Sequence, residues 1–210
     1  EMTGGGVGIL DFDGDGWPDI FLAQGSSWPP GSASPAHCDR LLRNLGASRG
    51  EQLPEFHNCT QAACINDQQF GQGVAIGDVN GDGALDLFVT NYHDESNTLY
   101  VQHPDGSFLD GTGSTGLATA SLPMLGFGTQ FIDAQLDGWA DLLVLNGHID
   151  DLTHLGIPYQ IRPQFFVGKS GMQFQLSGAD ETGDFFQHER LGRSLAWLDF
   201  DRDGKQDFVA

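Results

Sequence analysis

The chain repeats one short acidic unit four times, and this repetition restricts the fold more than any other feature. The first copy, "DFDGDGWPD", starts at Asp11 and places oxygen-bearing side chains at its first, third, fifth and ninth positions and a glycine at its sixth. The other copies start at Asp78, Asp133 and Asp199. Carboxylates this close together disfavour a compact turn unless a cation lies among them. Each copy therefore predicts a cation site.

The spacing matches the first nine positions of an EF-hand calcium loop, in which glycine at the sixth position permits a sharp turn and the seventh residue offers its backbone carbonyl. The likeness ends there, because the twelfth position of the first copy is Leu22 instead of Glu and no helical pattern flanks it. The flanking segments "GVGIL" and "IFLAQG" are instead typical of two buried strands. We therefore predict hairpin turns that bind up to four Ca²⁺ ions.

We call the four turns loops 1 to 4. The predicted ligands are Asp11, Asp13, Asp15, Trp17 and Asp19 in loop 1; Asp78, Asn80, Asp82, Ala84 and Asp86 in loop 2; Asp133, Gln135, Asp137, Trp139 and Asp141 in loop 3; and Asp199, Asp201, Asp203, Lys205 and Asp207 in loop 4. Trp17, Ala84, Trp139 and Lys205 would contribute only their carbonyls. Loops 1 and 4 have four carboxylates and are expected to bind best, and Gln135 makes loop 3 the weakest. The alternative for each loop is an empty polar turn.

Weaker hairpin signals lie between the loops, around Asp105-Gly106 and Ser170-Gly171. Each repeat then contains two hairpins, which make one four-stranded blade. Radial repetition of such blades buries both faces of each sheet, so the pattern predicts an all-β fold, a β-propeller. The expected repeats span about residues 5–70, 71–125, 126–190 and 191–210, which gives three full blades of antiparallel strands and half of another.

The units "GGGVGILDFDGDGWPDIFLAQG" and "FGQGVAIGDVNGDGALDLFVTN" resemble FG-GAP/VCBS repeats, the calcium-binding blades of integrin α-subunit propellers and of many bacterial surface proteins. The segments "GFGTQFIDAQLDGWADLLVLNGHIDD" and "GDFFQHERLGRSLAWLDFDRDGKQDFVA" are similar to bacterial relatives of cartilage acidic protein, in which an ASPIC/UnbV domain follows the propeller. The resemblance implies a fragment of a roughly seven-bladed ring. The alternative is a small ring in which the two ends of the chain complete one blade.

The net charge of the chain limits the classes of partner that it can bind. The formal net charge is −20, and four Ca²⁺ ions would reduce it to −12, so part of the acidity is a metal requirement. With nine Lys and Arg residues in total, nucleic-acid binding and attraction to anionic membranes are disfavoured. The sequence contains no apolar run long enough to insert into a membrane. Extracellular calcium modules typically bind at about 10⁻⁴ to 10⁻³ M, which favours an extracellular, periplasmic or cell-surface location.

The most favoured function is a calcium-stabilised binding or assembly module without catalysis of its own, which recognises a protein or a glycan through the inserts near residues 25–40 and 147–163. Trp28 and His37 lie in the first insert. One alternative is a polysaccharide lyase or dehydratase, which would need His148, His154 or His188 beside an unpaired carboxylate; Asp150 and Asp151 stand near the first two. Another is a purely structural subunit of a larger complex. The pairing of Cys38, Cys59 and Cys64 stays open.

Overall fold

The structure is a computed structural model that describes residues 5–26, 37–47 and 53–210. Its strands form three four-stranded antiparallel sheets and one two-stranded sheet, in chain order. The sheets contain β1 (Val7–Leu10), β2 (Asp19–Leu22), β3 (Arg40–Asn44) and β4 (Phe56–Asn58); β5 (Gly71–Gly77), β6 (Asp86–Asn91), β7 (Thr98–Gln102) and β8 (Phe108–Asp110); β9 (Gly126–Ile132), β10 (Asp141–Asn146), β11 (Gln164–Lys169) and β12 (Gln173–Leu176); and β13 (Ala196–Leu198) with β14 (Asp207–Val209). Three blades and half of a fourth are confirmed.

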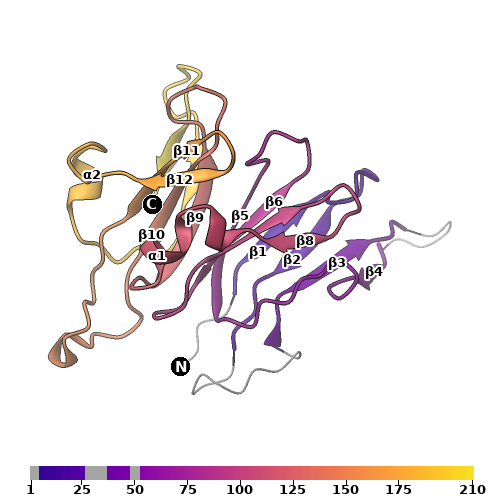
Figure 1. Ribbon diagram of the computed structural model, residues 1–210, viewed down its shortest axis with the longest axis horizontal. Coiled ribbons are helices and arrows are strands. Elements are labelled where there is room, and N and C mark those ends of the chain that lie inside the picture. Colours follow the sequence, from indigo (N-terminus) through magenta and orange to yellow (C-terminus); the bar gives the residue numbers. More distant parts are fainter. Residues whose placement is uncertain (1–4, 27–36, 48–52) are drawn as a thin grey trace.

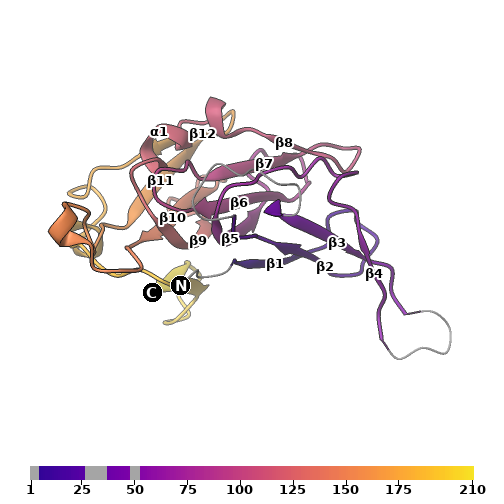
Figure 2. The same cartoon turned by 90° about the horizontal axis from the view of Figure 1, so that it is seen from below.

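The three four-stranded sheets stand side by side, and their first strands are neighbours (Figure 2). Strand β5 lies between β1 and β9. All four loops predicted to bind metal lie on one side of the molecule, at the top of Figure 1. The long segment between β10 and β11 lies on the opposite side.

A glycine five residues before each of the first three loops lets neighbouring blades approach closely. A Cβ on Gly73 would lie 1.9 Å from the carbonyl oxygen of Phe127, and one on Gly128 would lie 2.7 Å from the amide of Leu195. Gly6 would meet the backbone of the second blade at 3.0 Å. The repeated glycine therefore sets the distance between blades, since any side chain would push them apart.

The hydrophobic core lies between the sheets. One cluster joins the second and third blades through residues such as Phe88, Phe131 and Phe166, and another joins the first and second blades through Phe21 and Tyr100. Phe88 and Phe131 meet edge to face with ring centroids 6.3 Å apart, as do Phe21 and Tyr100 at 6.1 Å. These aromatic pairs hold adjacent blades together.

The prediction that both strands around loop 1 are buried was wrong for β1. Val7 and Ile9 are 60% and 66% exposed, whereas Gly8 and Leu10 on the other side of the strand are buried. The reason is that β5 packs against one side of β1, and nothing within the described residues covers the other.

Helices are short and connect strands: η2 (Thr112–Ser114), α1 (Leu117–Ser121), η3 (Thr153–Leu155) and α2 (Asp184–Gln187). Across the described ranges, no helix has the length and apolar character that a membrane-spanning segment requires. The two weaker hairpins are confirmed as β7–β8 and β11–β12, with Gly106 and Gly171 in the left-handed region at φ 81° and 77°.

Candidate metal loops

The four loops share one hydrogen-bonded turn. In each, the amide of the sixth-position glycine donates to the first aspartate; the distance is 2.9 Å from Gly16 to Asp11 and 3.2 Å from Gly204 to Asp199. The amide of the seventh residue donates to the carboxylate at position five, as Trp17 does to Asp15 at 2.9 Å. These bonds give the backbone of each loop the same turn.

Left-handed backbone occurs at two positions of every loop, of which the sequence analysis identified one. The sixth-position glycines have φ between 83° and 88°. The fourth position is left-handed as well, occupied by Gly14, Gly81, Leu136 and Arg202 with φ of 71°, 75°, 56° and 63°. Glycine at the fourth position of loops 1 and 2 is typical of left-handed backbone, whereas Leu136 and Arg202 at this position of loops 3 and 4 gave no such indication.

Carboxylate oxygens converge in two of the loops. One oxygen each from Asp11, Asp13 and Asp15 lie within 4.8 Å of one another, and the same holds for Asp199, Asp201 and Asp207. Oδ1 of Asp11 is buried without a hydrogen-bond partner. A buried anionic oxygen without a donor is costly. A hard cation with oxygen ligands would satisfy it, so loop 1 fits Ca²⁺ by its donor set.

The ninth-position aspartates have a role that the spacing did not reveal. Asp19, Asp86 and Asp141 are fully buried, and each accepts one backbone amide from its loop and one from the third strand of its blade. Burial raises the pKa of all three, that of Asp86 to about 6, against the lowering effect of these amides. Each oxygen keeps a second lone pair, so these bonds leave metal coordination possible.

Two basic residues lie against the carboxylates. In loop 1, Arg43 on β3 places Nε 2.5 Å from Asp13 and Nη2 3.0 Å from Asp15. In loop 4, Nζ of Lys205 lies 2.8 Å from Asp203. A hydrogen bond from the Trp17 amide, and then Arg43, lowers the pKa of Asp15; Lys205 lowers that of Asp203. Predicted ligands of loops 1 and 4 therefore already have cationic partners. Lys205 is part of loop 4, but Arg43 lies outside loop 1, so the sequence of loop 1 did not indicate its partner.

Loops 2 and 3 differ in their third position. In loop 2, Nδ2 of Asn80 donates to Asp82 at 2.9 Å, and Oδ1 of Asn80 accepts the amide of Asp82 at 2.9 Å. In loop 3, Gln135 is exposed, and the loop has three carboxylates, those of Asp133, Asp137 and Asp141. Asp133 also accepts the amides of Asp137 and Gly138, at 3.0 and 2.9 Å.

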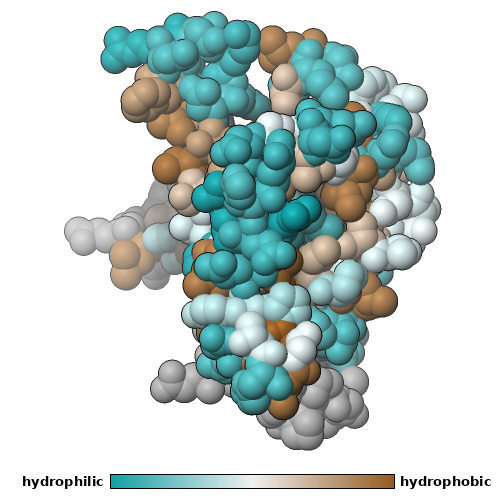
Figure 3. All heavy atoms as spheres, turned by 90° about the vertical axis from the view of Figure 1, so that its left-hand side faces the viewer, coloured by the Kyte–Doolittle hydropathy of each residue, from teal (hydrophilic) through white to brown (hydrophobic). Residues whose placement is uncertain are grey.

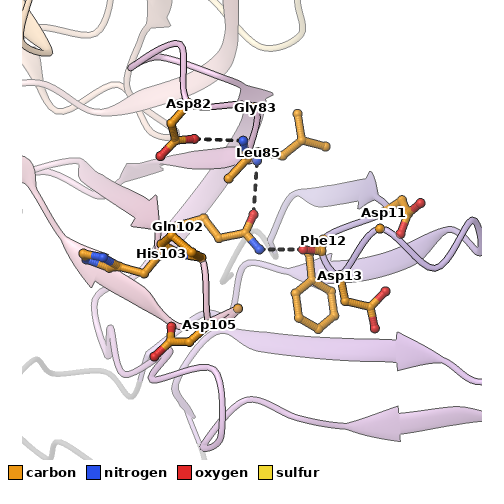
Figure 4. A pocket seen from close by; sticks show the side chains of 13 residues that line it. Asp11, Phe12, Asp13, Asp82, Gly83, Leu85, Gln102, His103 and Asp105 are labelled. Atoms are coloured by element: carbon orange, nitrogen blue, oxygen red, sulfur yellow. Dashed lines mark hydrogen bonds between the residues drawn. The ribbon is translucent and has the colours of Figure 1, made fainter.

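A groove of about 470 Å³ lies between loops 1 and 2 and the β7–β8 turn (Figure 4). Asp13, Asp82 and Asp105 are among its lining residues, and Gln102 crosses it. The Gln102 side chain donates to the carbonyl of Phe12 at 2.5 Å and accepts from the amide of Leu85 at 3.1 Å. The two loops are thus joined across the blade boundary.

The histidines considered for catalysis lie in different surroundings. His148 is buried, with its ring 6.1 Å from that of Tyr92 and 6.3 Å from that of His93. His154 is exposed, and His188, also exposed, lies 3.2 Å from Asp184. Asp150 meets His148 through its backbone, with its amide 3.2 Å from Nδ1.

Of the residues singled out in the first insert, His37 is half-buried and Trp28 lies outside the described residues. Cys59 and Cys64 are both free thiols, so they do not pair with each other. Cys59 donates its thiol to the carbonyl of Leu41 at 3.3 Å, whereas Cys64 is exposed. Cys38 and Cys64 line the same cavity beside β4.

Comparison with known proteins agrees with the repeat geometry. The FG-GAP-like repeat family matches residues 11–89 and 78–144, together more than half of the chain. Cartilage acidic protein 1 of Xenopus tropicalis is 27% identical over 146 residues, 70% of this chain and 22% of that protein. The chain thus spans about a fifth of the length of this curated relative. With its blades and loops in the places that the repeat requires, the chain belongs to the family of FG-GAP-like repeat proteins.

Proposed function

We propose that the four loops bind Ca²⁺ and that the ions act as structural staples of a binding module outside the cytoplasm. The observation that carries the metal assignment is the buried, unpartnered oxygen of Asp11 beside Asp13 and Asp15. The ligands would be the residues at positions one, three, five, seven and nine of each loop. A bound ion would neutralise the carboxylates and hold the turn between the first two strands of its blade.

A structural role suits these sites better than a catalytic one. Each loop supplies its own ligands, and the ninth aspartate of loops 1 to 3 connects the turn to the third strand of its blade, as Asp86 does through the Gln102 amide at 2.8 Å. Calcium at the loop would therefore stabilise three strands at once. Catalysis would instead need an open coordination position beside an acid or base.

The recognition surface is proposed on the side opposite the loops. The segment between β10 and β11 lies there (Figure 1), and it is a long connection containing only the short helix η3. Rigid blades that hold long loops are a common arrangement for binding sites. The partner would be a protein or a carbohydrate, as in a cell-surface or secreted module.

Metal counting tests the calcium assignment. After equilibrium dialysis against millimolar calcium, we expect up to four ions per chain. Asp78→Ala should remove one ion, whereas Asp180→Ala, a change at an exposed acid outside the loops, should remove none. A wild-type chain that retains no calcium would refute the assignment.

Incubation with neutral and acidic polysaccharides separates a binding module from an enzyme. Retention of the protein on a polysaccharide without any product supports the binding module. Appearance of unsaturated sugar ends would instead establish a lyase and refute the non-catalytic assignment.

A structural subunit is the second candidate, favoured by apolar side chains on the outer blades. Trp197 and Phe200 of the last hairpin are 52% and 81% exposed, in addition to Val7 and Ile9 on β1. Figure 3 shows hydrophobic patches among hydrophilic areas on the side that carries the third blade. These surfaces suit packing against another blade or subunit, and concentration-dependent light scattering would detect self-association through them.

A further inference from the structure

Gln102 at the end of β7 connects two blades through one buried side chain. It is 4% exposed, and both ends of its amide are used, one by each loop (Figure 4). Phe12, whose carbonyl accepts the amide, is the second residue of loop 1, between the predicted ligands Asp11 and Asp13. Leu85, whose amide donates, is the eighth residue of loop 2, between Ala84 and Asp86. Movement of either loop therefore changes the geometry at Gln102.

The connection continues into the buried carboxylate of each loop. The amide of Phe12 donates to Asp19 at 3.0 Å, and the amide of Gln102 itself donates to Asp86 at 2.8 Å. Hydrogen bonds thus run without interruption from the ninth position of loop 1 to the ninth position of loop 2. Both ends of this path are residues that calcium would hold in place.

The other blades show that this contact is specific to Gln102. Asn44 and Gly168 occupy the same position, because the amide of each donates to the ninth aspartate of its own loop, at 2.7 and 2.9 Å. Asn44 has a shorter side chain and donates to the carbonyl of Pro18 in its own loop at 3.0 Å. Gly168 has no side chain. Only the second of these three blades carries the longer amide that reaches its neighbour.

We propose that Gln102 couples calcium binding at loop 1 to calcium binding at loop 2, so that each ion raises the affinity for the other. This inference rests on the proposed calcium function. An ion in loop 1 fixes the Phe12 carbonyl and, through Gln102, the Leu85 amide of loop 2. The second ion then binds a loop that is partly ordered, which gives positive cooperativity that acts equally in both directions.

Amide resonances of Gly16 and Gly83 report on the two loops separately, because each donates to the first aspartate of its own loop at 2.9 Å. Calcium titrations followed by ¹H–¹⁵N NMR would give the affinity of loop 1 with loop 2 intact and with loop 2 disabled by Asp82→Ala. We expect the intact protein to bind at loop 1 about fivefold more tightly than the Asp82→Ala protein, at the lower end of typical coupling between sites.

Two variants test the role of Gln102. Gln102→Asn keeps the amide but shortens it to the side chain that Asn44 provides, and Gln102→Met keeps the length without the hydrogen bonds. Either should reduce the fivefold ratio to about one, while Gln61→Asn, the same shortening at an exposed glutamine outside the loops, should leave it unchanged. The Met variant serves if the Asn variant does not fold.

The outcomes separate this inference from the function on which it rests. A ratio that persists in both Gln102 variants would overturn the coupling while leaving calcium binding intact. A wild-type ratio of one would do the same. Glycine resonances that do not respond to calcium at all would overturn the proposed function, and the coupling with it.

Discussion

The guanidinium of Arg43 lies 2.5 Å from the carboxylate of Asp13, where a metal ion would need that carboxylate. It also reaches Asp15, so one side chain of β3 meets two of the predicted ligands of loop 1. Arg43 lies on strand β3 and is not part of loop 1. It partly neutralises the acidic loop, and a calcium ion bound there would have to compete with it.

Replacement of Arg43 by glutamine should therefore increase the calcium affinity of loop 1. The gain should be about two- to fivefold, because an ion pair this exposed is largely screened by solvent. Calorimetric titration measures it, with Arg162→Gln, a change at an exposed arginine, as the control. Weaker binding in the Arg43 variant would mean that the guanidinium supports the ligand geometry instead of competing.

Asp39 makes the stability of the first blade depend on pH. Burial, opposed by the Gln24 amide and increased by the charge of Asp67, raises its pKa to about 8. The folded state therefore holds a proton on Asp39 that the unfolded state loses near pH 4, and stability falls as pH rises from about 4 to 8.

Replacement of Asp39 by asparagine should remove this dependence. Blade 2 already has Asn97 at the same place: its Oδ1 accepts the Asn91 amide at 2.9 Å, as Asp39 accepts that of Gln24 at 2.8 Å. We expect the variant to be more stable than the wild type by a few kcal/mol at pH 8 and nearly equal to it at pH 4. Urea unfolding at several pH values measures the difference, and parallel pH profiles would contradict the assignment to Asp39.

Leu136 occupies the left-handed fourth position of loop 3 at φ 56°. Leu136→Gly should stabilise the protein by about 0.5–1 kcal/mol, because the left-handed conformation costs a non-glycine residue about 1–2 kcal/mol and glycine loses more chain entropy on folding. Leu109→Gly, at an exposed position of strand β8, should destabilise it. The melting temperature should rise in the Leu136 variant and fall in the Leu109 variant. Equal changes in the two melting temperatures would argue against strain at Leu136.

Gln135→Asp should raise the calcium affinity of loop 3. It gives the third position the shorter, charged side chain found in loops 1 and 4, and about a tenfold gain lies within the range over which ligand charge tunes calcium loops. The Gly138 amide, which donates to Asp133 at 2.9 Å, reports on this loop by NMR. Gln61→Asp adds the same charge at an exposed site outside the loops. An equal gain in calcium affinity in that variant would mean that the added net charge, and not a new ligand, causes the effect.

The repeat made the fold predictable. Because each loop must connect two strands, the four copies placed the first hairpin of every blade, and the glycines at 106 and 171 placed two of the second hairpins. The exposure of Val7 and Ile9 could not be read from "GVGIL", since an apolar strand looks the same whether or not a neighbour covers it.

The candidate site was predictable only within each loop. Spacing identified which oxygens converge in loop 1, and it could not show that Asp19, Asp86 and Asp141 are buried and bound by amides from another strand. The partners of the loops lie far away in sequence: Arg43 is 28 residues from Asp15, and Gln102 is 90 residues from Phe12. Such contacts depend on strand register and blade packing, which a local pattern does not encode.

The central claim, that calcium holds these blades together, is tested most directly by thermal unfolding of the 210-residue chain with calcium and with a chelator, alongside calorimetric counting of bound ions. We predict three or four ions and a large rise in melting temperature, since each site occupied at a hundred times its dissociation constant adds about 2.7 kcal/mol. The same cooperative melting temperature with and without calcium would contradict the account.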